Sequence, residues 1–262
     1  MSNLSQILVF GFSVVVLFVL LLVCLEAGRR IGIRHQKKGT ELSSAGLTAV
    51  DGAVFGLTGL IIAFTFSGAA SRFDARRQLI LQETNHIGTA YLRVDLLPAA
   101  YQSTVREDFR SYLDTRIAFY RHGFSDPKAR RADFAQSVAL QGKIWAEAVA
   151  GCRELNSPAT TSLVLSSLNE MIDITTTRAV ATETHPPFVI YWGLLVLVLA
   201  SSFLAGYGLA DVKKRNWIHL VVYAAVTAAV VYVIFDLEFP RMGLIRIDAA
   251  DHILMDLRAS MK

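Results

Sequence analysis

The chain has 262 residues, of which 53% are hydrophobic and only 18% are charged, and its formal net charge is +4. Soluble domains carry about 25% charged residues, so the composition argues against a soluble enzyme and favours a membrane protein. The apolar residues are concentrated in four blocks, each near the roughly 20 residues that a helix needs to cross a bilayer: Ile7–Leu25, Gly46–Ala70, Phe188–Leu209 and Trp217–Phe235.

The first block is predicted to be an uncleaved transmembrane helix. Met1–Gln6 contains no Lys or Arg, and the apolar run is longer than the core of a signal peptide. A basic cluster follows the block instead: Arg29, Arg30, Arg34, Lys37 and Lys38. By the positive-inside rule, this loop is predicted to be cytoplasmic.

The second block contains two stripes of residues at helical spacing. One consists of small side chains, which let helices approach closely: Gly52, Gly56, Gly59, Ala63, Ser67 and Ala70. The other is mixed, with hydroxyl groups along it: Thr48, Asp51, Phe55, Thr58, Ile62, Thr65, Ala69 and Arg72. The mixed stripe is typical of a pore lining, in which apolar members form constrictions that gate by dewetting. Buried packing, with each Thr hydroxyl bonded back to its own helix, explains the same stripe equally well.

Charged residues mark both ends of this span. An acid within a span is a functional candidate, and Asp51 is interpreted either as an ion contact or as a surface anchor. Arg72 and Arg76 lie four residues apart on one helix face, so a ring of them in an oligomer would attract anions. The alternative is that these arginines pair with Asp74 and Glu83.

Residues 71–186 are predicted to form a helical insert outside the membrane. Ser71–Leu97 lacks Pro, which favours continuation of the second span as one long helix, and Ala99–His122 is the next predicted helix. Two further starts are signalled by an N-cap residue followed by Pro, at Asp126-Pro127 and Ser157-Pro158. Apolar stripes on these helices predict a bundle around the long helix, or alternatively a ligand site. The stripe of the helix that starts at Pro127 is Phe134, Val138, Gln141, Trp145, Ala148 and Cys152.

Acidic residues follow the last span, where Pro240 and Gly243 predict a turn. We expect this segment to dock the tail, with salt bridges to Arg72 or Arg76. Two acids are too few for a calcium cage, so we predict no metal or other cofactor. The chain also lacks a phosphate loop, a zinc-protease motif and a nucleophile elbow, so an enzyme is not expected.

These features predict an all-α membrane protein, with four transmembrane helices and a helical extramembrane bundle inserted between spans two and three. The domains are 1–70 (spans one and two with the basic loop), 71–186 (the insert), 187–236 (spans three and four) and 237–262 (the tail). The loop between spans three and four carries Lys213, Lys214 and Arg215. It lies on the same side of the membrane as the first basic loop, so both loops predict the same orientation. Both termini and the insert are therefore predicted on the outer side, although Arg72, Arg76 and Arg77 favour the opposite. Topology explains the positive charge, so no nucleic-acid binding is expected.

Four stretches of the chain resemble the bacterial bestrophin-like family of unknown function, and more distantly the bestrophin anion channels: Gly59–Ser67, Ser71–Arg77, Glu83–Arg93 and Asp236–Gly243. Within them Glu83, Asn85, Asp236, Glu238 and Arg241 are the expected structural motif. The resemblance implies a homo-oligomer, such as a pentamer, in a bacterial inner membrane, with the second span lining an anion pore. Phe64 and Phe66, or Phe55 and Ile62, would form its neck. Two features depart from bestrophins: the predicted outer side of the insert, and the lack of an acidic calcium clasp.

The resulting hypothesis is an oligomeric, anion-preferring membrane channel embedded in the lipid bilayer, with small inorganic anions passing along the second span. Its candidate pore-lining residues are Thr48, Asp51, Phe55, Thr58, Ile62, Thr65 and Phe66, and its candidate anion-attracting residues are Arg72 and Arg76. The alternative hypothesis is a non-conducting membrane scaffold or sensor, whose extramembrane domain binds a partner or ligand.

Overall fold

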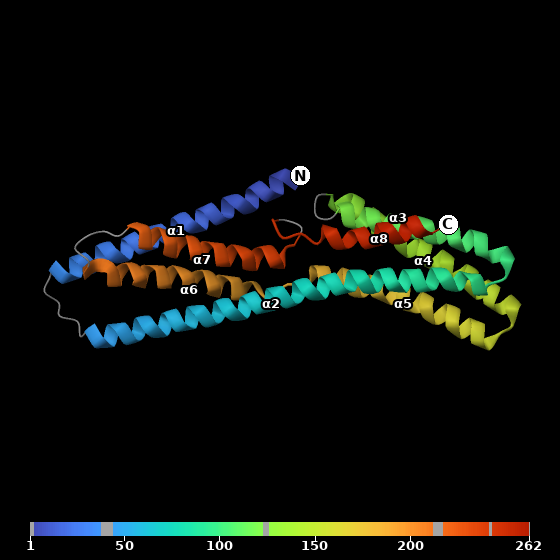
Figure 1. Ribbon diagram of the computed structural model, residues 1–262, viewed down its shortest axis with the longest axis horizontal. Helices are drawn as coiled ribbons and strands as arrows, with labels where there is room; N and C mark the ends of the chain where they lie inside the picture. Colours follow the sequence, from blue (N-terminus) through green and yellow to red (C-terminus); the bar gives the residue numbers. More distant parts are fainter. Residues whose placement is uncertain (1–2, 38–43, 123–125, 212–216, 241–242, 262) are drawn as a thin grey trace. The chain divides into compact units, whose positions relative to one another are not determined.

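The computed structural model describes residues 3–37, 44–122, 126–211, 217–240 and 243–261 (Figure 1). These residues form helices and no strand, which confirms the predicted all-α class. The α-helices are α1 (Asn3–Lys37), α2 (Ser44–Arg93), α3 (Ala99–His122), α4 (Pro127–Leu155), α5 (Pro158–Glu183), α6 (Phe188–Gly208), α7 (Trp217–Glu238) and α8 (Asp248–Ser260), with 3₁₀ turns η1 (Val94–Leu96) and η2 (Leu209–Asp211).

Within the described residues, four segments are long and apolar enough to cross a membrane, in agreement with the four predicted spans. Their bounds are Gly11–Gln36, Ala49–Leu96, Pro158–Gly208 and Trp217–Glu238. The helix α2 is continuous over 50 residues, as the lack of Pro predicts, and is therefore about 75 Å long. The placement of the insert outside the membrane stays a prediction.

Two side-chain caps explain where α4 and α5 begin. The carboxylate of Asp126 accepts hydrogen bonds from the backbone N–H groups of Lys128 (3.1 Å) and Ala129 (3.0 Å). The hydroxyl of Ser157 accepts one from the N–H of Thr160 at 3.4 Å. Such caps satisfy backbone donors that a helix start leaves without partners.

The described chain forms two compact units. The membrane unit comprises 4–73 and 185–245 and contains α1, the first part of α2, α6 and α7. Buried Leu21, Leu25, Leu194 and Val198 lie in its core. The bundle unit comprises 74–184 and 246–262 and contains the rest of α2 with α3, α4, α5 and α8. The tail is shared between the two units, and the four-part division made from the sequence stays a prediction.

Glycines bring the backbones of α1 and α6 into direct contact. A Cβ atom on Gly206 would overlap the carbonyl oxygen of Leu25, and one on Gly28 would overlap that of Phe203. Each helix thus presents a glycine to the backbone of the other, an arrangement that membrane helices use for close packing. The small-residue prediction concerned α2, so this contact was not anticipated.

The bundle unit has its own apolar core. The helix α3 packs against α4 and α8, and α4 packs against α5. Phe109, Tyr112 and Leu113 of α3 are fully buried, and Leu254 of α8 joins them. The sequence interpretation did not predict α8.

Candidate functional site

The apolar part of α2 uses one face to pack within its own unit. Thr58 and Ala69 are buried on this face. The hydroxyl of Thr58 lies 2.6 Å from that of Ser201 on α6 and donates to the carbonyl oxygen of Val54 at 2.7 Å. The hydroxyl of Thr65 donates to the carbonyl oxygen of Ile61 at 2.7 Å. Both threonines therefore bond back to their own helix, which reduces the groups they offer to water.

The opposite face of α2 is exposed and carries glycines. A Cβ atom added to Gly52, Gly56 or Gly59 would meet no atom of another part of the described chain within 4 Å. Leu60 and Phe64 lie beside these glycines, and the Phe64 side chain is 65% exposed. A membrane helix with such a face has room for close contact with another helix.

The predicted pore-lining residues do not share one environment. Phe55 and Phe66 are exposed, whereas Asp51 and Ile62 are half-buried. The hydroxyls of Thr58 and Thr65 donate hydrogen bonds to carbonyl oxygens of α2 itself. The side chain of Thr48 lies outside the described residues. The role of all seven in lining a pore stays a prediction.

A carboxylate joins three parts of the membrane unit at one end of α7. Glu238 has no exposed surface, and its Oε2 accepts hydrogen bonds from Arg72 Nε at 2.8 Å and Nη2 at 2.6 Å. Its Oε1 lies 2.8 Å from Nδ1 of His185, just before α6. The expected salt bridge between the segment after the last span and Arg72 is therefore confirmed. This bridge ties α2 to α7, and the Glu238 carboxylate competes with free anions for the guanidinium of Arg72.

The other motif residues have separate roles. In the membrane unit, Asp236 Oδ2 accepts hydrogen bonds from the N–H groups of Leu244 and Ile245, both at 3.0 Å. A Cβ atom on Gly243 would overlap this carboxylate, so only glycine fits there. In the bundle unit, Arg76 donates to the carbonyl oxygens of Ala181 (3.1 Å) and Thr184 (3.0 Å). Arg241 lies outside the described residues.

Glu83 is the centre of a buried charge cluster in the bundle unit. Its carboxylate has no exposed surface and lies 2.7 Å from Arg116 Nε, and it also pairs with Arg178. Tyr120 donates to Glu83 Oε2 at 3.1 Å and accepts a hydrogen bond from Arg116. The expected alternative pairing of Glu83 with the arginines of α2 is wrong, because α3 and α5 supply closer partners. Asn85 is exposed on α2.

Burial and charge together shift the pKa values of this cluster. Burial is the largest cause that raises the pKa of Tyr120, and the neighbouring Glu83 carboxylate raises it further. Arg116 keeps its charge because Glu83 and two tyrosines raise the pKa of its guanidinium against the effect of burial. The cluster therefore holds one negative and two positive charges away from water, and it fixes α2, α3 and α5 to one another.

Sequence reasoning missed Arg116, Arg178 and Tyr120. Arg116 and Tyr120 lie four residues apart, so they share a helix face. The one available signal was an arginine within the stripe of α3 that also carries Phe109, Tyr112 and Leu113.

The arrangement defines a multi-pass helical membrane protein in which one long helix passes from a four-span unit into a helical bundle. A family model described as the bestrophin-like domain matches residues 12–251. The chain therefore belongs to the bestrophin-like family.

Solved structures of a bacterial bestrophin homologue from Klebsiella pneumoniae have the same fold. One variant shares 18% identity with a TM-score of 0.67, covering 95% of this chain and 100% of that chain. Another shares 17% identity with a TM-score of 0.69, covering 95% and 99%. A third structure, phased with zinc, shares 16% identity with a TM-score of 0.67, covering 95% and 98%. At these identities the likeness establishes the fold alone. No curated protein matches the chain.

Proposed function

We propose that the chain is one subunit of a homo-oligomeric, anion-preferring membrane channel whose pore is lined by α2. The observation that carries this proposal is the exposed small-residue face of α2, on which a Cβ atom added to Gly52, Gly56 or Gly59 would meet no atom of the described residues within 4 Å outside its own stretch of helix. Other helices pack on such faces in membranes. Membership of the bestrophin-like family supports the proposal, since bestrophins in general are oligomeric anion channels.

The exposed face also supports a choice of neck residues. In a ring of copies, the small residues let neighbouring α2 helices approach closely, and the remaining exposed part of this face, with Leu60 and Phe64, points toward the axis. Gly56, Leu60 and Phe64 recur every four residues on this face, so they line one side of the helix. Phe64 and Leu60 are then the apolar constriction. Phe66 lies two residues after Phe64 and faces elsewhere, so these two cannot form one neck.

Phe55, Ile62 and Phe66 form the rival neck. Their spacing of seven and four residues places them together on a different side of α2. Phe55 and Phe66 are exposed as well, and only Ile62 is half-buried. Alanine substitutions at the two sets therefore provide matched tests of which face lines the pore.

Charge supports the preference for anions. Between Asp51 and Asp74 the helix α2 carries no acidic residue, and Arg72, Arg76 and Arg77 surround Asp74. The side chain of Arg77 is 58% exposed and 3.7 Å from Asp74. This excess of positive charge raises the local concentration of anions. The neutralisation of Arg72 by Glu238 weakens its own contribution.

The test is planar-bilayer recording of the purified protein under a KCl gradient. The wild type is expected to give currents that reverse near the chloride potential. Phe64→Ala is expected to raise conductance or open probability, because it removes an apolar constriction. Phe55→Ala and Phe66→Ala serve as matched controls and are expected to leave the current unchanged.

Each other outcome has a defined meaning. Reversal near the potassium potential would retain the pore but contradict the anion preference. An effect of Phe55→Ala and Phe66→Ala without one of Phe64→Ala would assign the neck to the rival face. Silence of both the wild type and Phe64→Ala, with protein shown to be folded and inserted, would favour the non-conducting scaffold or sensor.

The proposed location is the inner membrane of a bacterium, with the insert on the outer side. Positive residues of the loops favour this orientation, whereas the resemblance to bestrophin channels favours the cytoplasm. The four apolar helices support a multi-pass location in either orientation.

A further inference from the structure

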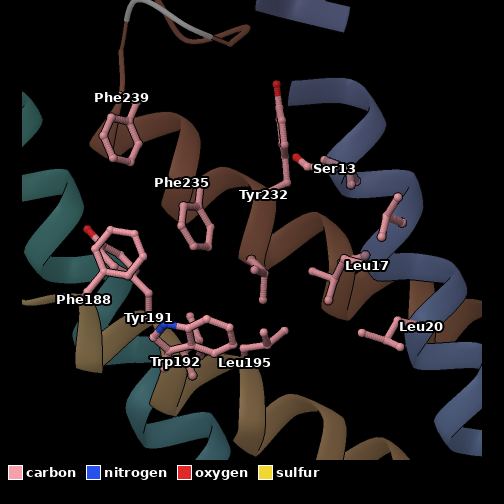
Figure 2. Close-up of a pocket in the computed structure, with 15 residues that line it drawn as sticks. Ser13, Leu17, Leu20, Phe188, Tyr191, Trp192, Leu195, Tyr232, Phe235 and Phe239 are labelled. Carbon is pink, nitrogen blue, oxygen red and sulfur yellow. The ribbon is translucent and has the colours of Figure 1, made fainter. Parts of the chain in front are cut away.

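A cavity of about 580 Å³ lies within the membrane unit, between α1, α6 and α7. Figure 2 shows side chains of all three helices pointing toward it, among them Leu17 and Leu20 of α1, Phe188 and Trp192 of α6, and Phe235 of α7. Its volume falls within the roughly 300–1,000 Å³ of ligand sites in proteins.

The lining of this cavity favours a hydrocarbon occupant. Most lining residues have purely apolar side chains, such as Leu195 and Val231. Apolar cavities bind apolar molecules rather than water. The cavity also lies along candidate membrane spans, so the surrounding medium is lipid rather than water.

The length of the cavity favours a thin chain over a helix. Along α6 it extends from Phe188 to Leu195, or about 12 Å at 1.5 Å per residue, and along α7 from Ala228 to Phe235, or about 12 Å, with Phe239 just after the helix. A helix with side chains is about 10–12 Å in diameter and packs along a long groove. A short space among three helices suits an acyl chain better.

Two lining residues, Tyr232 and Phe239, connect the cavity to polar groups near the end of α7. The hydroxyl of Tyr232 accepts a hydrogen bond from the N–H of Leu244 at 3.3 Å. The ring of Phe239 lies against that of His185, with centroids 4.7 Å apart, and His185 contacts the buried Glu238 carboxylate. The apolar interior and the polar end match the two parts of a phospholipid.

We propose that the cavity between α1, α6 and α7 binds one acyl chain of a membrane phospholipid, with the headgroup at the end marked by Tyr232 and Phe239. This inference is independent of conduction, because it concerns helices other than the proposed pore helix.

The test uses the full-length protein, reconstituted in vesicles of palmitoyl-oleoyl phosphatidylethanolamine and then extracted into detergent. Native mass spectrometry measures the phospholipid retained per chain. The wild type is expected to retain a phospholipid. Val231→Trp, which fills the cavity, is expected to lose most of the retained phospholipid. The matched control is Val222→Trp on the same helix, where the side chain is 54% exposed and does not line the cavity.

A second readout keeps the test independent of one variant. Leu17→Phe fills the cavity from α1 and is expected to act as Val231→Trp does. In a chain with Trp145→Phe and Trp217→Phe, phospholipid with brominated acyl chains that survives extraction is expected to quench Trp192 fluorescence. Leu17→Phe should restore that fluorescence.

Three outcomes would overturn the proposal. Equal phospholipid retention by the wild type and the two filling variants would show that lipid binds elsewhere. Retention of a free fatty acid alone would remove the headgroup assignment. Absence of lipid together with disulfide cross-links between copies through Leu195→Cys would show that a second chain covers the cavity.

Discussion

At the scale of single residues, Glu83 connects helices that are far apart in the sequence. It lies on α2, while its partners Arg116 and Arg178 lie on α3 and α5. All three side chains are nearly or fully buried. A buried ion pair adds little net stability over apolar packing, but removal of one partner leaves an uncompensated charge.

Glu83→Gln is therefore expected to destabilise the bundle unit strongly. It leaves two buried guanidinium groups without their carboxylate, and breaking such a pair costs about 3–5 kcal/mol. Chemical or thermal unfolding of the purified protein measures the loss. Asp114→Asn is the control, since it breaks the exposed pair with Arg258 and should cost under about 1 kcal/mol. Similar losses for both variants would contradict the role of burial.

Tyr120 should make stability fall at alkaline pH. Burial and the Glu83 carboxylate raise its pKa in the folded state, whereas an unfolded tyrosine has a pKa near 10. Above about pH 10 the unfolded chain releases this proton and the folded chain retains it, so stability is lost as pH rises, by about 1.4 kcal/mol per pH unit. Below that pH the contribution is fully present.

Unfolding of the wild type and Tyr120→Phe between pH 8 and pH 11 checks this sign. Tyr120→Phe should be less stable at pH 8, because Glu83 and Arg116 each lose a hydrogen-bond partner. Its stability should then fall less steeply above pH 10. Parallel curves for the two proteins would disprove the assignment.

At the scale of helices, the contact of α1 with α6 depends on the absence of side chains. A Cβ atom on Gly206 would overlap backbone atoms of Leu25, and backbone atoms cannot rotate away as a side chain can. The two helices would have to separate, at the expense of the packing around them.

Gly206→Ala is expected to destabilise the membrane unit by about 1–3 kcal/mol, as overpacking does. Thermal unfolding in detergent measures this as a lower midpoint. Gly193→Ala on the same helix is the control, because a Cβ atom there meets nothing within 4 Å and alanine favours helix. An unchanged midpoint for Gly206→Ala would show that α1 and α6 are not in contact.

Helix bounds were well predicted from the sequence, because local signals determine them. The predicted starts at Pro127 and Pro158 agree with α4 and α5, and Ala99–His122 agrees with α3. The buried face of α4 was predicted less well: Val138 is 48% exposed, and Ile144 is buried in its place. Spacing defines a stripe, but neighbouring helices determine which part of it is covered.

Contacts between distant residues could not be predicted, because they depend on how the helices pack. Nothing in the spacing of Thr58 and Ser201, or of Glu83 and Arg178, indicates that they meet. The helix α8 was missed because it is short, and its apolar Leu254 and Leu257 become informative only when α3 and α2 are beside it.

At the scale of the whole molecule, the side of the membrane on which 71–186 lies is open to a direct test. In a chain with Cys24→Ala and Cys152→Ala, Val138→Cys places a thiol on an exposed part of α4. The loop charges predict that an impermeant maleimide labels it in intact cells. Gln36→Cys, at the end of the first span, is the opposite control and should react only after permeabilisation. The reverse pattern would place the domain in the cytoplasm.

The bundle unit is assembled from residues on both sides of the last two spans in the chain. Its core includes Ile87 of α2 and Leu254 of α8, while α6 and α7 lie between them in the sequence. During synthesis on the ribosome, this core is therefore completed only after α6 and α7 have been translated. Until then the α8 side of the core remains open, which makes the nascent chain a substrate for chaperones or proteases during that interval.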